Sequence, residues 1–110
     1  MPINLFEMLL WTFRRNETDV VNLYNSLSPI MQLSTGGDML NFGRWDNSTN
    51  TPIEAQNNLC EFTGKMANLP TAKSLVDVGS GILGPAKKWN SDYPNLEIFA
   101  ININYNAKRI

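Results

Sequence analysis

The chain has 110 residues, of which 43% are hydrophobic and 17% charged, and this composition fits a folded domain with a single core. Its formal net charge is −1 and its basic and acidic residues are mixed along the sequence, which excludes the basic stripe of a nucleic-acid-binding surface. It contains no histidine, which excludes a Ser-His-Asp triad, a histidine base and a histidine-ligated metal, and we predict no metal site.

Residues 1–13 are apolar enough to resemble a secretion signal, but their pattern argues against one. Glu7 interrupts the apolar run, no basic region precedes it and no small-residue cleavage site follows. No segment has the roughly 18–20 uninterrupted apolar residues that a membrane-spanning helix needs. The single cysteine, Cys60, cannot form an internal disulfide, in agreement with a reducing compartment. We therefore expect a cytoplasmic protein without stable membrane insertion.

The first half of the chain is predicted to be helical. Asn4 and Glu7 have the spacing of a capping box, and apolar residues then recur at helical intervals, which predicts a helix over residues 5–15. We expect its apolar stripe to pack in the core, with a lid over a substrate pocket as the alternative. A second helix is predicted to begin near Thr18 and to weaken at Ser28, because a residue before proline disfavours the helical region.

A loop is predicted to follow the second helix. Residues 34–51 are dense in turn-forming residues and should be a loop. Phe42 and Trp45 are unusual in a linker, and they either cover the core or belong to a functional loop.

The third helix has a strong start signal. Thr51 has the character of an N-cap, Pro52 suits the first helical position, and Glu54 completes a capping box. The helix should end at residues 68–70. Cys60 is expected to be a small buried hydrophobe and not a nucleophile. The face predicted to be apolar consists of Ala55, Leu59, Phe62 and Met66.

From Ser74 onward the pattern changes to strand, glycine turn, helix and strand. Residues 75–78 form a short apolar run that ends at a glycine, as a buried strand does. Residues 84–90 have room for a short helix, residues 96–103 predict a second strand, and a further helix is expected from Tyr105. A β-α-β unit places its strands parallel, so we predict the α/β class.

The glycine turn has a recognisable spacing. Gly79-Ser80-Gly81-Ile82-Leu83-Gly84 fits G-x-G-x-x-G between the predicted strand and helix. The first glycine permits a tight turn, the second lets a ligand approach the backbone, and the third permits close helix packing. The spacing suits a dinucleotide or S-adenosylmethionine (SAM), and a plain strand-to-helix turn is the alternative. Asp77 favours SAM, because this strand position is usually apolar in dinucleotide folds.

These residues resemble the first motif of class I SAM-dependent methyltransferases, in which an apolar strand and an acid precede Gly-x-Gly. Residues 84–86, Gly-Pro-Ala, are similar to the segment that follows this motif in sterol-type methyltransferases. Residues 41–46 resemble the Gly-Tyr-Trp loop of many small-molecule methyltransferases, and residues 54–56 resemble the Glu-Ala-Gln of sterol and cyclopropane-fatty-acid types. Residues 101–104 are similar to the end of the second strand of the family, so the resemblance covers about residues 40–110.

The resemblance implies a cofactor site at the glycine turn. It places the backbone of Gly79, Ser80 and Gly81 against the amino-acid and ribose portions of SAM. It also implies that Asp77 orients this turn and the methionine end of the cofactor, directly or through water.

Asn102 and Ile103 are the remaining cofactor-binding residues that the resemblance implies. Asn102 stands where the family more often has an acid that binds both ribose hydroxyls, and Ile103 would pack beside adenine. An amide accepts one hydrogen bond and donates another, so we expect weaker ribose selection, with a plain cap of the strand end as the alternative. Two further departures from the family are Leu83, at a frequent glycine position, and Arg44, in place of the loop tyrosine.

The resemblance implies a Rossmann-like SAM methyltransferase fold that is incomplete in this chain. Residues 1–70 are predicted to be an N-terminal helical lead or lid, and residues 71–110 the first β-α-β portion of the SAM-binding core. Two strands of about seven would leave apolar surface exposed, so we expect an N-terminal fragment that is inactive alone, binds SAM weakly or self-associates.

The function implied is methyl transfer from SAM to a small-molecule acceptor. Alignment in a dry site would supply most of the rate, and no residue of the chain is a credible general base. The catalytic residues, the acceptor and the methylated atom are therefore open. Two alternatives remain: a non-catalytic partner or relic of a methyltransferase, and a fragment of an NAD-dependent oxidoreductase.

Overall fold

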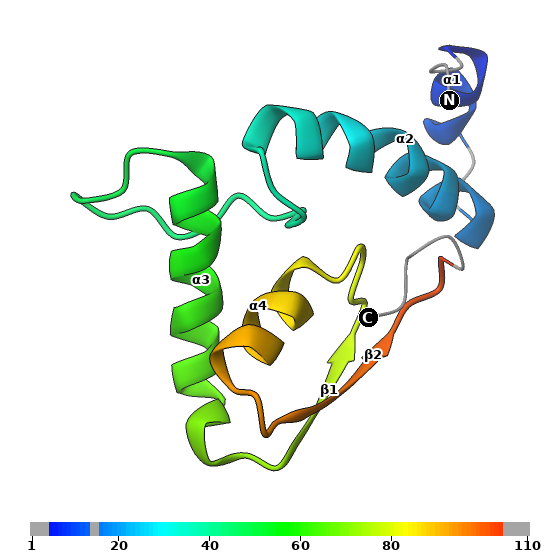
Figure 1. Cartoon of the computed structure of the whole chain (residues 1–110). Coiled ribbons are helices and arrows are strands. Elements are labelled where there is room, and N and C mark those ends of the chain that lie inside the picture. Colours follow the sequence, from blue (N-terminus) through cyan, green and yellow to red (C-terminus); the bar gives the residue numbers. More distant parts are fainter. Residues whose placement is uncertain (1–4, 14–15, 105–110) are drawn as a thin grey trace.

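The computed structural model describes residues 5–13 and 16–104, in which helices precede a small parallel sheet (Figure 1). The helical elements before the sheet are α1 (Leu5–Trp11), α2 (Glu17–Thr35), α3 (Pro52–Met66) and a 3-10 turn (Leu69–Thr71). They are followed by strand β1 (Ser74–Val78), helix α4 (Gly84–Asp92) and strand β2 (Glu97–Ile101). The chain is thus a small mixed helix and strand domain.

The two strands form a parallel sheet, which confirms the predicted β-α-β unit. Their register runs from Ser74 opposite Glu97 to Val78 opposite Ile101. The carboxyl ends of both strands point toward α2, and α3 and α4 lie to one side of the sheet (Figure 1). Alternate residues of β1 are half-buried and exposed, as the two-residue period of a strand requires.

The outer face of the sheet is apolar and exposed. Val76 and Val78 of β1 and Phe99 and Ile101 of β2 are 50–77% exposed within the described part of the chain. Parallel sheets are normally covered on both faces, so the described residues leave one face of this sheet without its usual cover.

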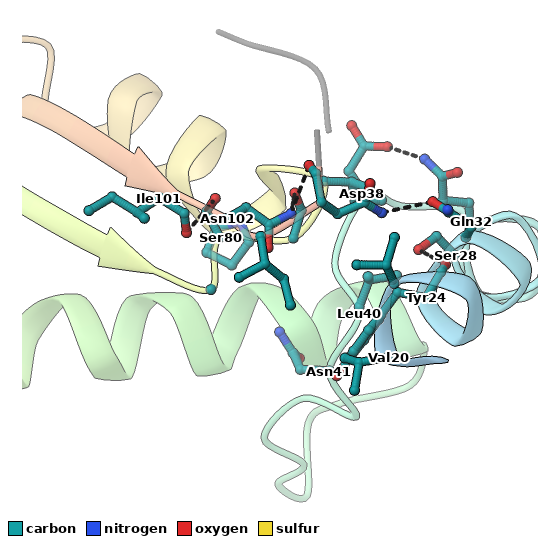
Figure 2. A pocket seen from close by; sticks show the side chains of 18 of the residues that line it. Val20, Tyr24, Ser28, Gln32, Asp38, Leu40, Asn41, Ser80, Ile101 and Asn102 are labelled. Carbon is teal, nitrogen blue, oxygen red and sulfur yellow. Dashed lines mark hydrogen bonds between the residues drawn. The ribbon is translucent and has the colours of Figure 1, made fainter. Parts of the chain in front are cut away.

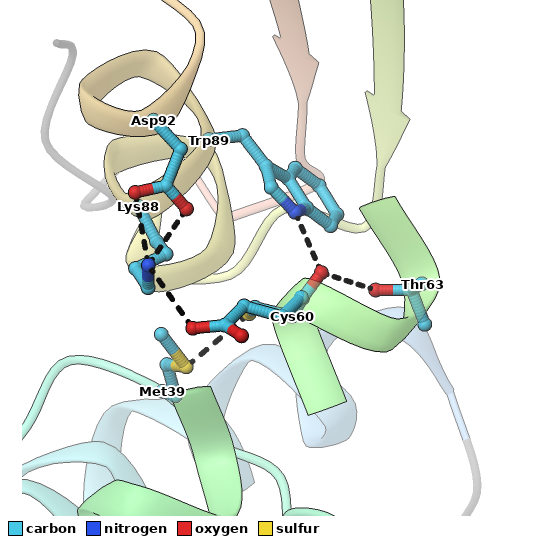
Figure 3. Close-up of polar contacts among 7 residues, drawn as sticks. Met39, Cys60, Thr63, Lys88, Trp89 and Asp92 are labelled. Carbon is cyan, nitrogen blue, oxygen red and sulfur yellow. Dashed lines mark hydrogen bonds and ion pairs between the residues drawn. The ribbon is translucent and has the colours of Figure 1, made fainter. Parts of the chain in front are cut away.

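The core lies where α3 meets α4 (Figure 3). Cys60 is buried, and its carbonyl accepts a hydrogen bond from Trp89 Nε1 at 3.0 Å. Burial raises the pKa of the Cys60 thiol to about 11, so the thiolate is scarce at neutral pH. Lys88 of α4 adds an ion pair to Asp92 at 2.6 Å and a longer one to Glu61 at 3.8 Å. The prediction that Cys60 is a buried hydrophobe is confirmed.

The start of α3 is as predicted. The Thr51 side chain accepts a hydrogen bond from the Glu54 backbone N–H at 3.3 Å, and the Glu54 carboxylate accepts one from the Thr51 N–H at 3.2 Å. Both bonds of a capping box are therefore present.

The buried face of α3 differs from the predicted one. Phe62 is 42% exposed and Met66 is 74% exposed. A Cβ at Gly64 would lie 3.2 Å from Trp89 Nε1, so α4 approaches α3 along its small residues. The residues that α3 buries are Ala55, Gln56, Cys60 and Gly64. Cys60 and Gly64 face α4. By contrast, Gln56 Nε2 donates to the Met39 and Asn41 carbonyls of the loop before α3.

The first helix is shorter than predicted and does not join the core. It ends at Trp11, whereas the sequence predicted a helix over residues 5–15. The predicted cap at Asn4 lies outside the described residues. Four members of its apolar stripe are 60–83% exposed, so the expected core packing is wrong for the described structure. These residues are Leu5, Phe6, Leu9 and Phe13.

The second helix begins and ends with clear caps. Asn16 is the N-cap: its side chain accepts a hydrogen bond from the Asp19 N–H at 2.9 Å, and Asp19 completes a capping box. The helix ends at Gly36, which has a φ of 75° and donates its N–H to the Gln32 carbonyl at 2.9 Å. The predicted loop therefore begins after Thr35, two residues later than expected.

The expected weakening of this helix at Ser28 is wrong, because α2 continues through Pro29. Proline removes one backbone donor and crowds the preceding turn, but both effects are preferences that a well-capped helix can overcome. Ser28 Oγ donates to the Tyr24 carbonyl at 2.6 Å, which gives this turn a further hydrogen bond.

The loop before α3 is attached to that helix through its backbone. The Arg44 N–H donates to the Ala55 carbonyl at 2.7 Å. A Cβ at Gly43 would overlap the Ala55 carbonyl carbon, so only glycine fits this approach. Phe42 is 87% exposed and therefore does not cover the core, whereas Trp45 is half-exposed and donates Nε1 to the Phe42 carbonyl at 2.9 Å.

The C-terminal predictions are confirmed in part. The second strand ends at Ile101, two residues before the predicted end, so Asn102 and Ile103 follow the strand. The helix expected from Tyr105 lies outside the described residues. Among the described helices, none has both the length and the apolar character needed to cross a bilayer.

Candidate functional site

A cavity of about 810 Å³ lies between α2 and the carboxyl ends of the two strands. Figure 2 shows side chains of α2, among them Tyr24 and Gln32, across the cavity from Ser80 and Asn102. In parallel α/β sheets, ligands bind outside the carboxyl ends of the strands. The cavity therefore occupies the position at which a ligand is expected.

The glycine turn forms the floor of this cavity. Gly79 has a φ of 77° and Gly81 a φ of 55°, values in the left-handed region that glycine adopts without strain. The N–H groups of Gly79 and Ser80 both donate to the Ile101 carbonyl, at 2.7 and 3.2 Å. These bonds attach the turn to the end of β2, so that strand, tight bend and helix follow one another as predicted.

The third glycine permits a close contact at the start of α4, where close helix packing was expected. A Cβ at Gly84 would overlap the Asp38 carbonyl oxygen, so Gly84 lets the loop after α2 approach the start of α4. The partner in this contact, the loop, was not predicted. Leu83, which precedes Gly84, has a φ of 70°, in the left-handed region that residues with a side chain rarely adopt.

Asn102 lies beside the glycine turn. Its Nδ2 donates to the Gly81 carbonyl at 3.3 Å and lies 3.5 Å from the Asn104 carbonyl oxygen. Both contacts use the amide nitrogen, and they fit the alternative of a polar cap at the strand end. The ribose role of Asn102 remains a prediction that depends on its Oδ1 atom.

Five of the six predicted cofactor-binding residues line the cavity. They are Gly79, Ser80, Gly81, Asn102 and Ile103. The structure thus brings the turn after β1 and the segment after β2 together at one site, although they are about 20 residues apart in the sequence.

Asp77 does not line this cavity. It shares the helix-facing side of β1 with Leu75, and its Oδ2 atom is buried without a hydrogen-bond partner in the described part of the chain. Burial raises the pKa of the Asp77 carboxyl above its usual value. A direct contact with a ligand in this cavity is therefore not seen, and the positioning role of Asp77 remains a prediction.

The opposite wall of the cavity was not predicted. Gln32 Nε2 of α2 donates to Asp38 Oδ1 at 2.8 Å, and Lys87 Nζ of α4 lies 2.5 Å from Asp38 Oδ2. Asn25 of α2 accepts a hydrogen bond from Asn104 Nδ2 at 2.7 Å. The sequence contained no signal for these contacts, because they join segments up to 79 residues apart.

The two adjacent lysines of α4 each have an acidic partner: Lys87 pairs with Asp38, and Lys88 pairs with Asp92. Within residues 5–13 and 16–104, no group of three or more metal-ligating side chains comes together.

Comparisons of the chain with protein-family models, with curated protein sequences and with solved structures returned no match.

Proposed function

We propose that the chain binds SAM in the cavity at the carboxyl ends of β1 and β2, as part of a Rossmann-like fold that transfers a methyl group to a small molecule. The observation that carries this proposal is the position of the glycine turn: it lies at the carboxyl end of β1, is attached to the end of β2 and opens into a cavity of about 810 Å³. This volume falls in the range of small-molecule and cofactor sites, roughly 300–1,000 Å³.

The backbone geometry of the glycine turn supports a placement of the amino-acid and ribose portions of SAM against it. Gly79 and Gly81 have no side chain, so a ligand can approach the backbone closely. Ser80 of this turn is buried, and its Oγ lies 3.4 Å from the Ile101 carbonyl oxygen. A turn held in this way presents a preformed surface, which reduces the entropy lost on binding.

The segment after β2 supports the proposed contacts with the ribose and the adenine ring. Asn102 uses its amide nitrogen on the turn, and its amide oxygen is the group that would accept a hydrogen bond from a ribose hydroxyl. Ile103 is 62% exposed at the edge of the cavity, where an apolar side chain would gain by covering an adenine ring.

Methyl transfer requires alignment of the acceptor with the sulfonium carbon and the exclusion of water. In our proposal the chain contributes the cofactor seat, while no residue is assigned as a general base. The half-buried wall formed by α2 would restrict access of water to the same site.

The proposal is tested by isothermal titration of the full chain with S-adenosylhomocysteine, SAM and NAD. We expect the two sulfur-containing ligands to bind and NAD to bind more weakly or not at all. Asn102→Ala should weaken S-adenosylhomocysteine binding about tenfold, the effect of one hydrogen bond to a ligand.

Asn90→Ala is the matched control, because Asn90 is an exposed residue of α4 outside the cavity. It should leave the affinity unchanged. Binding of NAD alone would contradict the proposal and favour the oxidoreductase alternative. Binding of none of the three would also contradict it and would favour a non-catalytic partner or an unstable fragment.

A further inference from the structure

The charged residues that line the cavity form an ion pair at its rim. Asp38 lies in the loop after α2 and Lys87 in the first turns of α4, and they are the charged side chains among the described residues of the lining. Both are close to half exposed, 42% for Asp38 and 47% for Lys87, so a ligand in the cavity can reach them. The rim therefore presents one negative and one positive charge side by side.

The position of this pair is set by the fold. The Asp38 backbone packs against Gly84 at the start of α4, and Gln32 donates a hydrogen bond to Asp38 Oδ1. Lys87 lies in the first turn of α4, and its Nζ reaches Asp38 Oδ2 at 2.5 Å. The two charges and the glycine turn thus line the same cavity.

Two backbone donors of the glycine turn are not available to the amino-acid end of the cofactor. The N–H groups of Gly79 and Ser80 are already bound to the Ile101 carbonyl, so they are not free to neutralise a carboxylate. The α-amino acid portion of SAM carries one ammonium and one carboxylate group. A neighbouring pair of opposite charges is complementary to such a zwitterion.

We infer that Asp38 binds the α-ammonium group and Lys87 the α-carboxylate group of the cofactor, so that the pair selects ligands with a free amino-acid end. This inference rests on the proposed function. An exposed ion pair contributes little to folding, so the two side chains can exchange their mutual contact for contacts with the ligand at small cost. Each ligand charge then gains a partner of opposite sign.

The test compares two ligands that differ only in the amino-acid end. The affinity of the full chain for S-adenosylhomocysteine and for 5′-methylthioadenosine, which lacks the amino acid, is measured by titration calorimetry. Lys87→Met and Asp38→Asn should each weaken S-adenosylhomocysteine binding about tenfold and leave 5′-methylthioadenosine binding within about twofold. Lys87→Arg keeps the charge and should retain most of the affinity.

Lys65→Met is the control, because Lys65 is exposed on α3 and away from the cavity. Circular dichroism establishes that each variant is folded. Equal losses for both ligands, or no loss for either, would overturn the inference while leaving the proposed function intact. If the unaltered chain binds neither ligand, the proposed function fails, and this inference fails with it.

Discussion

At the scale of single residues, Asp77 carries one of the two buried polar side-chain atoms that have no hydrogen-bond partner among the described residues; the other is Gln56 Oε1. The unpartnered atom of Asp77 is Oδ2, and burial raises the pKa of the carboxyl group. A buried charge without a partner destabilises a fold and is retained most often where it serves function. The position of Asp77, two residues before the glycine turn, fits a positioning role in the proposed cofactor site.

We predict that Asp77→Asn raises the free energy of unfolding at neutral pH. The folded carboxyl group has the higher pKa, so ionisation favours the unfolded chain. The stability of the unaltered protein should then increase as the pH falls through the folded pKa toward 3.8, the value of an unperturbed Asp. The amide of the variant does not ionise, so its thermal unfolding, followed between about pH 4 and about pH 7, should lack this contribution.

Asp46→Asn is a control for which we expect the opposite change in stability. Hydrogen bonds from Ser48 and Thr49 lower the pKa of the exposed Asp46 carboxyl. Its ionised form therefore favours the folded state, and Asp46→Asn should lower stability at neutral pH, with the difference disappearing in acid. If Asp77→Asn and Asp46→Asn change the free energy of unfolding in the same direction, the opposite pKa shifts of the two carboxyl groups are contradicted.

At the scale of elements, the helix ends depend on short-range contacts and the helix faces on long-range ones. The capping box of α3 involves Thr51 and Glu54 alone, and both bonds form as their spacing predicts. By contrast, the face that α3 buries depends on α4, whose Trp89 packs against Gly64 and bonds to Cys60, and on the loop before α3, which accepts hydrogen bonds from Gln56. A periodic pattern identifies a helix more reliably than it identifies the partner of that helix.

Thr51→Ala should lower the free energy of unfolding by about 1 kcal/mol, the usual effect of removing an N-cap side chain. The Ala side chain cannot accept the hydrogen bond from the Glu54 N–H. Urea denaturation monitored by circular dichroism measures the change. Thr18→Ala, an exposed position in the first turn of α2, is the matched control and should change stability by less than about 0.5 kcal/mol.

At the scale of the whole molecule, the described residues cover one face of the sheet and leave the other exposed. Val76, Val78, Phe99 and Ile101 form this apolar face, and among the described residues each of the two strands pairs with the other alone. Exposed apolar faces and unpaired strand edges are sites of association between copies of a chain.

We predict that the chain self-associates as its concentration rises, through this face of the sheet. Phe99→Lys places a charge in the centre of the face and should shift the sedimentation velocity toward that of a monomer. Leu33→Lys, at an 88% exposed position on α2, introduces the same charge elsewhere and should not. A chain that is monomeric at all concentrations before substitution would refute the prediction.

The local elements of this protein could be predicted from sequence because their causes are local. The capping box at Thr51, the strand before Gly79 and the short helix after the glycine turn each depend on residues a few positions apart, and all three are present. The β-α-β order also implied parallel strands, because a helical crossover returns the chain in the same direction. Five of the six predicted site residues line the cavity for the same reason: they follow the ends of adjacent parallel strands.

The contacts between distant segments and the surroundings of each helix were decided by tertiary structure alone. The role of Gly84, the pairing of Lys87 with Asp38 and the contribution of α2 to the cavity depend on segments that approach one another only after folding. The passage of α2 through Pro29 and the exposure of the α1 stripe have no local signal, since propensity and periodicity describe what a segment prefers and not what surrounds it. Local chemistry determined the turn and strands of this site, and contacts between distant segments determined its walls.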